Sequence, residues 1–166
     1  MLMHKNECFK TSSTVNVMTR ALPNSEVRIQ GVQHRPLDLQ GVLASAGEVL
    51  LLFPETSAIP LSVEEAPKIR RPVTLIVPDG TWTQAKKIAA RVSAFPGVRR
   101  VRVPTEVPSR YRLRSSDRGS RLCTLEAVAR ALGALESVEI QRSLESLLDH
   151  LVKRVLITRS GPQARL

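Results

Sequence analysis

The sequence predicts one α/β domain with a largely parallel sheet flanked by helices. Two short apolar segments, residues 49–53 and 73–77, each end at a proline and are rich in branched side chains. Such segments are typical of strands that are buried on both faces of a parallel sheet. Helical patterns alternate with them along the chain, which is the order expected of an α/β fold. At 166 residues and 42% hydrophobic content, the chain has enough material for one core.

The predicted elements follow one another closely around these two strands. Residues 36–46 predict a short helix that ends at Gly47. After the second strand, Thr81 is placed to cap a helix that runs to about Phe95, where a Pro-Gly pair stops it. Residues 98–103 then alternate apolar with basic side chains, which predicts a strand with one wet, positive face near an edge of the sheet.

The C-terminal third predicts two amphipathic helices, at residues 124–135 and 140–157, followed by a frayed tail. Residues 104–121, which precede them, are irregular and basic. A loop of this length usually has a function. Its arginines are Arg110, Arg112, Arg114, Arg118 and Arg121.

The charge of the chain makes a polyanionic partner plausible. Its 25 Lys and Arg against 15 Asp and Glu give a net charge of +10. On charge alone, binding to a nucleic acid and the absence of any specific partner are about equally plausible. Cys8 and Cys123 are too few for a disulfide framework or a four-thiolate zinc site, and neither His4 nor His34 has a set of metal ligands around it. Because no segment has the pattern of a signal peptide or membrane span, we expect a cytoplasmic protein without membrane contact.

The candidate site lies where the strands end. Ligands of parallel sheets bind beyond the carboxyl ends of the strands, so residues 53–54, 78–80 and 104–105 are expected to converge on one pocket. Asp79 lies in one of these turns and would orient a substrate, for instance by accepting a hydrogen bond from a uracil imide. The alternative is structural: Asp79 and Thr81 are ordinary helix caps and Trp82 packs beneath the sheet.

Four linked segments give this stretch more weight, because they have the order and spacing found in DTW-domain proteins. The chain resembles that family to about Leu135, and the N-terminal His4, Glu7 and Lys10 are also similar to it. The four segments are DGTW (79–82), QAKKI (84–88), SRYRLR (109–114) and CTLEA (123–127).

The resemblance implies a SPOUT-like α/β fold with a C-terminal trefoil knot, and a single DTW domain over residues 1–166. It also implies transfer of the 3-amino-3-carboxypropyl group of S-adenosylmethionine to N3 of a uridine, typically in tRNA. Two features depart from the family. The cysteine cluster that binds zinc is missing, so the chain is a compact version or the cluster lies outside this sequence. Residues 12–16 replace the family's Thr-Asn-Thr-Gly-Arg segment, so the substrate here can differ from the family norm.

Carried over to this sequence, the family's site would have Asp79 as the catalytic or orienting acid, with Thr81 and Trp82 shaping the pocket. Glu126 either receives the amino group of the cofactor or completes the cap of its helix. Cys123 is expected to be a small wall residue, since no histidine lies near it in sequence to activate a nucleophile. The two walls of the S-adenosylmethionine site would be Leu52, Phe53 and Pro54 on one side and Leu122, Cys123 and Thr124 on the other.

Basic residues around this site are the candidates for RNA binding, with a solvated surface as the alternative for each. Tyr111 either stacks on a base or belongs to the core. The expected phosphate contacts are Lys10, Lys86, Lys87, Arg110, Arg112 and Arg114.

Other functions stay open at this point. One is aminocarboxypropylation of a ribosomal RNA pseudouridine, and another is methyl transfer, which is common in SPOUT-like pockets. A third is a non-catalytic RNA-binding protein that keeps the fold but has lost a working cofactor pocket. The expected partner is tRNA, no metal is expected, and we expect a monomer, with a homodimer as the alternative.

Overall fold

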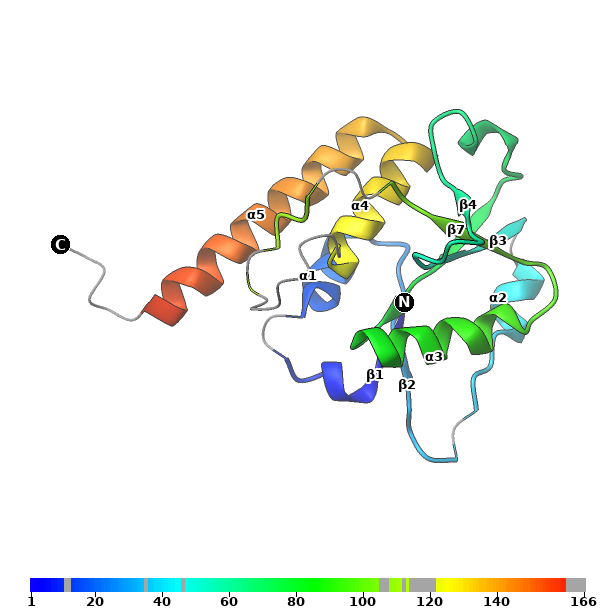
Figure 1. Ribbon diagram of the computed structural model, residues 1–166, viewed down its shortest axis with the longest axis horizontal. Helices are drawn as coiled ribbons and strands as arrows, with labels where there is room; N and C mark the ends of the chain where they lie inside the picture. The colour runs from blue at the N-terminus through cyan, green and yellow to red at the C-terminus, as the bar shows by residue number, and fades with distance from the viewer. Residues whose placement is uncertain are drawn as a thin grey trace.

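The computed structural model describes residues 1–10, 13–34, 36–45, 47–104, 108–111, 113 and 122–160. Strands and helices alternate along the chain, and a long helix at the C-terminal end projects away from the sheets (Figure 1). In chain order the elements are β1 (Leu2–His4), the 3-10 helix η1 (Lys5–Glu7), α1 (Thr14–Ala21), β2 (Arg28–Gln30), α2 (Gln40–Ser45), β3 (Glu48–Leu52), β4 (Ile59–Pro60), the 3-10 helix η2 (Ala66–Lys68), β5 (Val73–Ile76), β6 (Pro78–Asp79), α3 (Trp82–Ser93), β7 (Val98–Arg102), α4 (Thr124–Leu135) and α5 (Val138–Ser160).

The strands form two parallel sheets that share one stretch of chain. One sheet has the order β2-β1-β6 and the other β4-β7-β3-β5. The backbone over residues 73–79 serves both: β5 pairs with β3, and two residues later β6 pairs with β1, with Met3 opposite Asp79. The predicted parallel arrangement is confirmed, and its bend brings the N-terminus beside the end of β6.

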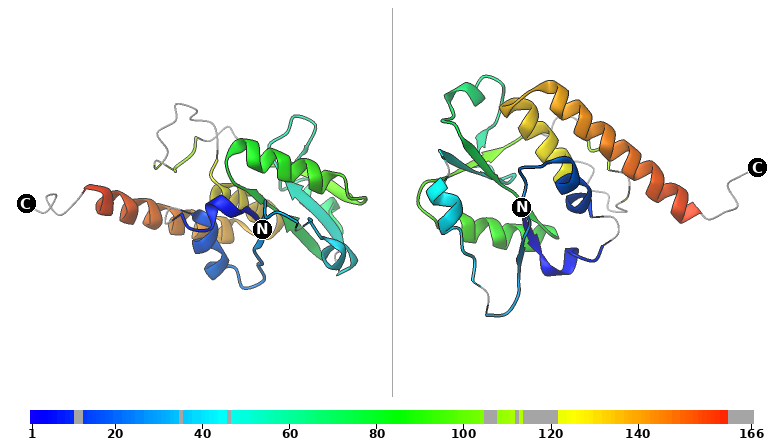
Figure 2. Two further views of the ribbon diagram at one scale, coloured as in Figure 1. Left: turned by 90° about the horizontal axis from the view of Figure 1, so that it is seen from below. Right: turned by 180° about the vertical axis from the view of Figure 1, so that it is seen from behind.

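Both faces of β3 are covered, as its continuous apolar sequence predicts. Leu50 and Leu52 belong to the core cluster under α1, α4 and α5. Leu51 and Phe53 point to the opposite face and pack in the cluster that includes α3, because neighbouring side chains of a strand alternate between faces. The helices therefore form two layers with the sheets between them (Figures 1 and 2).

Strand β7 differs from its prediction in its position in the sheet and in the ion pairs of its arginines. It lies one strand in from the edge, because the two-residue β4 pairs with its carboxyl end. Its arginines are also not free: Arg99 forms an ion pair with Glu48 at 2.8 Å, and Arg100 forms one with Glu55 at 3.1 Å. The Arg99 guanidinium holds the pKa of the Glu48 carboxyl below its ordinary value. The positive charge of this strand is thus partly neutralised within the protein.

The N-terminal elements were not predicted. β1 and β2 have three residues each, too few for a hydrophobic period to be recognised. The predicted helices at 124–135 and 140–157 are confirmed, the second extending over residues 138–160. Among the described helices, none has the length and apolar character needed to cross a bilayer.

Candidate active site

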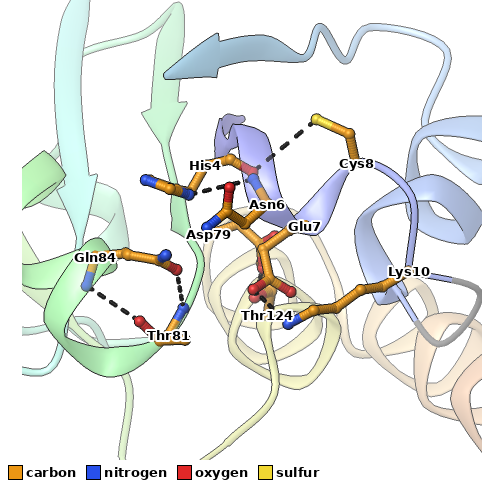
Figure 3. A network of polar contacts seen from close by, with 9 residues as sticks. All are labelled: His4, Asn6, Glu7, Cys8, Lys10, Asp79, Thr81, Gln84 and Thr124. Atoms are coloured by element: carbon orange, nitrogen blue, oxygen red, sulfur yellow. Dashed lines mark hydrogen bonds and ion pairs between the residues drawn. The ribbon is translucent and has the colours of Figure 1, made fainter. Parts of the chain in front are cut away.

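Asp79 lies at the carboxyl end of β6 and is nearly buried, with 9% of its surface exposed. Its Oδ1 accepts a hydrogen bond from the Thr124 hydroxyl at 2.5 Å (Figure 3). Thr124 is the first residue of α4, 45 positions further along the chain. This contact joins two of the four family segments, DGTW and CTLEA, and fixes one oxygen of the carboxylate.

The turn after Asp79 is built around a capping box. The Thr81 backbone N–H donates to Gln84 Oε1 at 2.8 Å, and the Gln84 N–H donates to Thr81 Oγ1 at 3.4 Å. A β-carbon on Gly80 would lie 3.0 Å from the β-carbon of Gln84 and 3.3 Å from that of His4, so the close approach of both side chains requires glycine here. The predicted cap of α3 is confirmed, and the role of Thr81 in a pocket stays a prediction.

Trp82 does not pack beneath the sheet. It is 40% exposed and stacks on Phe53, with ring centroids 5.2 Å apart and the planes at 28°. Phe53 directly follows β3 and is 8% exposed. The residue after β3 is thereby brought into contact with the start of α3, and the partly exposed Trp82 follows Asp79 by three residues.

Glu126 is the most deeply buried carboxylate that the structure describes, at 2% exposure. Its Oε2 accepts hydrogen bonds from the Ser109 hydroxyl at 2.7 Å and from the Cys123 backbone N–H at 2.8 Å. Its Oε1 accepts one from the Arg110 backbone N–H at 2.5 Å. Since three donors of the chain itself occupy this carboxylate, the geometry favours the cap over a contact with the amino group of a cofactor.

Cys123 is buried beside that carboxylate. Burial, and next the nearby Glu126 charge, raise the pKa of the Cys123 thiol from 9.0 to about 12. The thiol is therefore protonated at neutral pH and a poor nucleophile, which agrees with a role as a small wall residue.

The proposed cofactor walls are divided between the two faces of the fold. Leu52 is buried in the cluster with α4, whereas Phe53 lies on the α3 side. Pro54 is exposed, and the half-buried Leu122 packs against the α4 cluster. Phe53 is thus the only one of the first three that joins the stack with Trp82.

The predicted RNA-binding residues fall into two groups. Lys86 and Lys87 are exposed on α3, within about a turn of Trp82. Lys10 is also exposed but forms an ion pair with Glu7 at 2.7 Å.

The second group belongs to the basic loop. Arg110 is paired with Asp149 of α5 at 3.0 Å and lies 3.9 Å from Glu145, so its guanidinium holds the loop against that helix. Tyr111 is half-buried against the core, as its alternative interpretation predicts. Arg112 and Arg114 lie outside the described residues.

A turn at the N-terminus also borders the site, and its role was missed. His4 caps η1, because its Nδ1 accepts a hydrogen bond from the Asn6 N–H at 3.3 Å. The Glu7 side chain is 14% exposed and bound to Lys10. Figure 3 shows these side chains in the same view as Asp79 and Thr124. The available signal was the family-like spacing of His4, Glu7 and Lys10, which carries no periodicity.

A protein-family model, described as the DTW domain, matches residues 1–156. The chain belongs to the DTW domain family. Its DTW domain is 38% identical over 117 residues to tRNA-uridine aminocarboxypropyltransferase 2 of Drosophila melanogaster, a match that covers 70% of this chain and 45% of that protein. It is 31% identical over 171 residues to the protein of the same name from Mus musculus, covering 100% of this chain and 56% of that protein. The chain thus spans about half the length of these relatives.

Among solved structures, the DTW domain is similar to that of the SAM-dependent rRNA:acp-transferase Tsr3 from Vulcanisaeta distributa. The TM-score is 0.53 at 16% sequence identity, and the match covers 99% of this chain and 79% of that one. At this identity the likeness shows a shared fold.

Proposed function

We propose that this chain transfers the 3-amino-3-carboxypropyl group of S-adenosylmethionine to N3 of a uridine in tRNA. The observation that carries the proposal is the nearly buried Asp79 carboxylate, which Thr124 fixes three residues before the partly exposed Trp82. DTW relatives of this chain are named tRNA-uridine aminocarboxypropyltransferases, and the acid lies in the DGTW segment that it has in common with the family.

The residues present fit a sulfonium cofactor. A permanent cation is attracted both to the face of a tryptophan and to a carboxylate, and Trp82 and Asp79 offer these two groups within one turn. Phe53 supports the tryptophan from behind. The remaining wall residues would be Leu52, Pro54, Leu122, Cys123 and Thr124, with Glu126 holding the last three in place through the cap of α4.

S-adenosylmethionine supplies a carbon made electrophilic by the adjacent sulfonium. A bond forms from that carbon to N3 of the uridine, the carbon–sulfur bond breaks, methylthioadenosine leaves with the electron pair, and the N3 proton passes to a base or to water. Such a displacement depends chiefly on positioning and the exclusion of water. Asp79 would accept a hydrogen bond from the uracil imide and orient it, Thr124 would hold the carboxylate in that orientation, and Thr81 and Trp82 would shape the pocket.

The cations nearest to this pocket would contact the tRNA backbone. Lys86 and Lys87 on α3 are best placed, and Lys10 lies on the neighbouring N-terminal turn. Arg110 and Tyr111 would contribute mainly by fixing the loop, since Arg110 is bound to α5 and Tyr111 packs on the core. Arg112 and Arg114 remain predicted phosphate contacts.

We further propose that the C-terminal elements form the trefoil knot of SPOUT-like folds, which would hold residues 122–124 rigidly as a cofactor wall. The protein would act as a monomer in the cytoplasm. Cys8 and Cys123 are both free thiols, in keeping with a reducing compartment.

The direct experiment incubates the purified protein with unmodified tRNA and S-adenosylmethionine, followed by nucleoside mass spectrometry. The expected product is a uridine heavier by one aminocarboxypropyl group, with release of methylthioadenosine. A methylated nucleoside would contradict the transferred group, and product on rRNA alone would contradict the acceptor. RNA binding without any product would support the non-catalytic alternative.

A further inference from the structure

Phe9 is the most exposed large apolar side chain that the structure describes, with 94% of its surface open to solvent. Aromatic rings usually contribute to a core or an interface, since their large apolar surface is unfavourable in water. Phe53, by contrast, is buried and stacked on Trp82. The ring of Phe9 is therefore available to a ligand.

The backbone around Phe9 is held in a defined turn. The Cys8 N–H donates to the Lys5 carbonyl at 3.4 Å, and the Lys10 N–H donates to the Glu7 carbonyl at 3.2 Å. The side chains of Lys10 and Glu7 form an ion pair at 2.7 Å across the same turn. A ring carried on a fixed turn loses little conformational entropy when a ligand binds to it.

This turn borders the candidate active site. It follows β1, in which Met3 lies opposite Asp79, and begins at His4, whose β-carbon would be 3.3 Å from one placed on Gly80. In Figures 1 and 2 the dark blue turn lies beside the end of α3 that starts at Trp82. Phe9 is thus on the segment that follows the strand paired with Asp79.

The charges on either side of Phe9 indicate what it binds. Lys5 and Lys10 are both exposed, and the whole chain carries a net charge of +10. The ion pair of Lys10 with Glu7 is at the surface and therefore weak, so Lys10 can exchange it for a phosphate. An aromatic ring between cations is the arrangement by which proteins bind single-stranded RNA, with the ring stacked on an unstacked base and the cations on phosphates. An apolar protein partner would gain nothing from two flanking lysines.

We propose that Phe9 stacks on a nucleobase next to the uridine that is modified, while Lys5 and Lys10 contact the flanking phosphates. This inference rests on the proposed function for its RNA substrate. It adds a residue that helps to choose the sequence context or loop geometry of that substrate.

The test compares Phe9→Ala, Phe9→Leu and Phe9→Trp with the wild type. Val63→Ala is the control, because Val63 is 73% exposed on a different segment.

Binding of a fluorescent, uridine-containing single-stranded RNA is measured by anisotropy, in parallel with KM for unmodified tRNA and the dissociation constant of S-adenosylmethionine. Since loss of one base–aromatic stack weakens binding roughly 5- to 100-fold, Phe9→Ala and Phe9→Leu should raise the RNA dissociation constant and KM by that factor. Phe9→Trp and Val63→Ala should not, and cofactor binding should not change.

The outcomes separate this proposal from the proposed function. If no variant and no wild type transfers a group, but Phe9→Ala loses RNA binding, the stacking role stands and the transferase assignment fails. If Phe9→Ala binds RNA as the wild type does, or the wild type binds no RNA, the stacking role is wrong. A loss of self-association in Phe9→Ala with unchanged RNA binding would instead show a protein contact and overturn the proposal.

Discussion

Helices α3 and α4 both begin at the candidate active site with a capping box, but the two beginnings have opposite surroundings. At α3, Thr81 and Trp82 are exposed and the box is completed by the neutral Gln84. At α4, Cys123 is buried and the box is completed by Glu126, at 2% exposure. The start of α3 is therefore a surface that a substrate can contact, whereas the start of α4 is a buried packing contact within the protein.

The hydrogen bonds show what each beginning does. Gln84 and Thr81 bond to each other in the box, whereas Glu126 also accepts from Ser109 and Arg110, which lie 17 and 16 residues before it in the sequence. Asp79 on the α3 side is then tied to Thr124 on the α4 side. The exposed half of the site, at the start of α3, therefore depends for its geometry on the buried half, at the start of α4. Substitutions in the two halves should have different consequences.

The largest difference is expected in stability. Glu126→Ala leaves one buried and two part-buried donors without a partner, so the free energy of unfolding should fall by about 3–5 kcal/mol. Gln84→Ala removes an exposed cap contact and should lower it by only about 0.5–1 kcal/mol. Urea denaturation followed by circular dichroism measures both, with Glu126→Gln as a variant of matched shape. Equal losses of stability in Glu126→Ala and Gln84→Ala would contradict the proposed difference between the two helix starts.

The contact between the halves is tested by Thr124→Val. This change keeps the shape of the side chain but removes the hydroxyl that orients Asp79. A hydrogen bond to a charged group contributes about 1.5–3 kcal/mol, so transfer should slow by roughly 10- to 100-fold, while Thr124→Ser should stay near the wild-type rate. If Thr124→Val transfers at the wild-type rate, the orientation of Asp79 does not depend on this bond.

A smaller effect is expected at the exposed aromatic face. Trp82→Ala removes a ring that would lie against the sulfonium, and such a contact contributes about 0.5–2 kcal/mol. The dissociation constant of S-adenosylmethionine, measured by calorimetry, should rise about tenfold, and Trp82→Phe should recover most of that loss. Unchanged affinity in Trp82→Ala would place the cofactor away from this face.

The last expected effect concerns the Cys123 thiol in the buried half. Iodoacetamide at pH 8 should modify the half-buried Cys8 and leave Cys123 unmodified until urea unfolds the chain. Because folding raises the pKa of Cys123 to about 12, the folded state keeps a proton that the unfolded chain releases above about pH 9. The free energy of unfolding should therefore fall as pH rises from about 9 toward 12, and less steeply in Cys123→Ala. Rapid labelling of Cys123 in the folded protein would contradict its burial.

The sequence predicted those elements that are long enough to show a hydrophobic period. Residues 49–53 and 124–135 were predicted correctly, because continuous apolar strands and amphipathic helices carry a recognisable period. β1 could not be predicted, since three residues have no period and its partner Asp79 lies 76 positions away from Met3. The candidate site followed the same division: Asp79 and Trp82 were found from a local motif, whereas their contacts with Thr124 and Phe53 depend on tertiary packing.

We infer that the Asp79 carboxylate, held between the two halves, orients the acceptor for group transfer. Asp79→Asn tests this claim, because the amide keeps an oxygen that accepts a hydrogen bond from the Thr124 hydroxyl while the side chain loses its charge. The measurement is the rate of methylthioadenosine release with unmodified tRNA, at equal concentrations of folded protein. We predict a rate at least about 100-fold below that of the wild type at saturating S-adenosylmethionine, with the urea midpoint little changed. A wild-type rate in Asp79→Asn would contradict the claim.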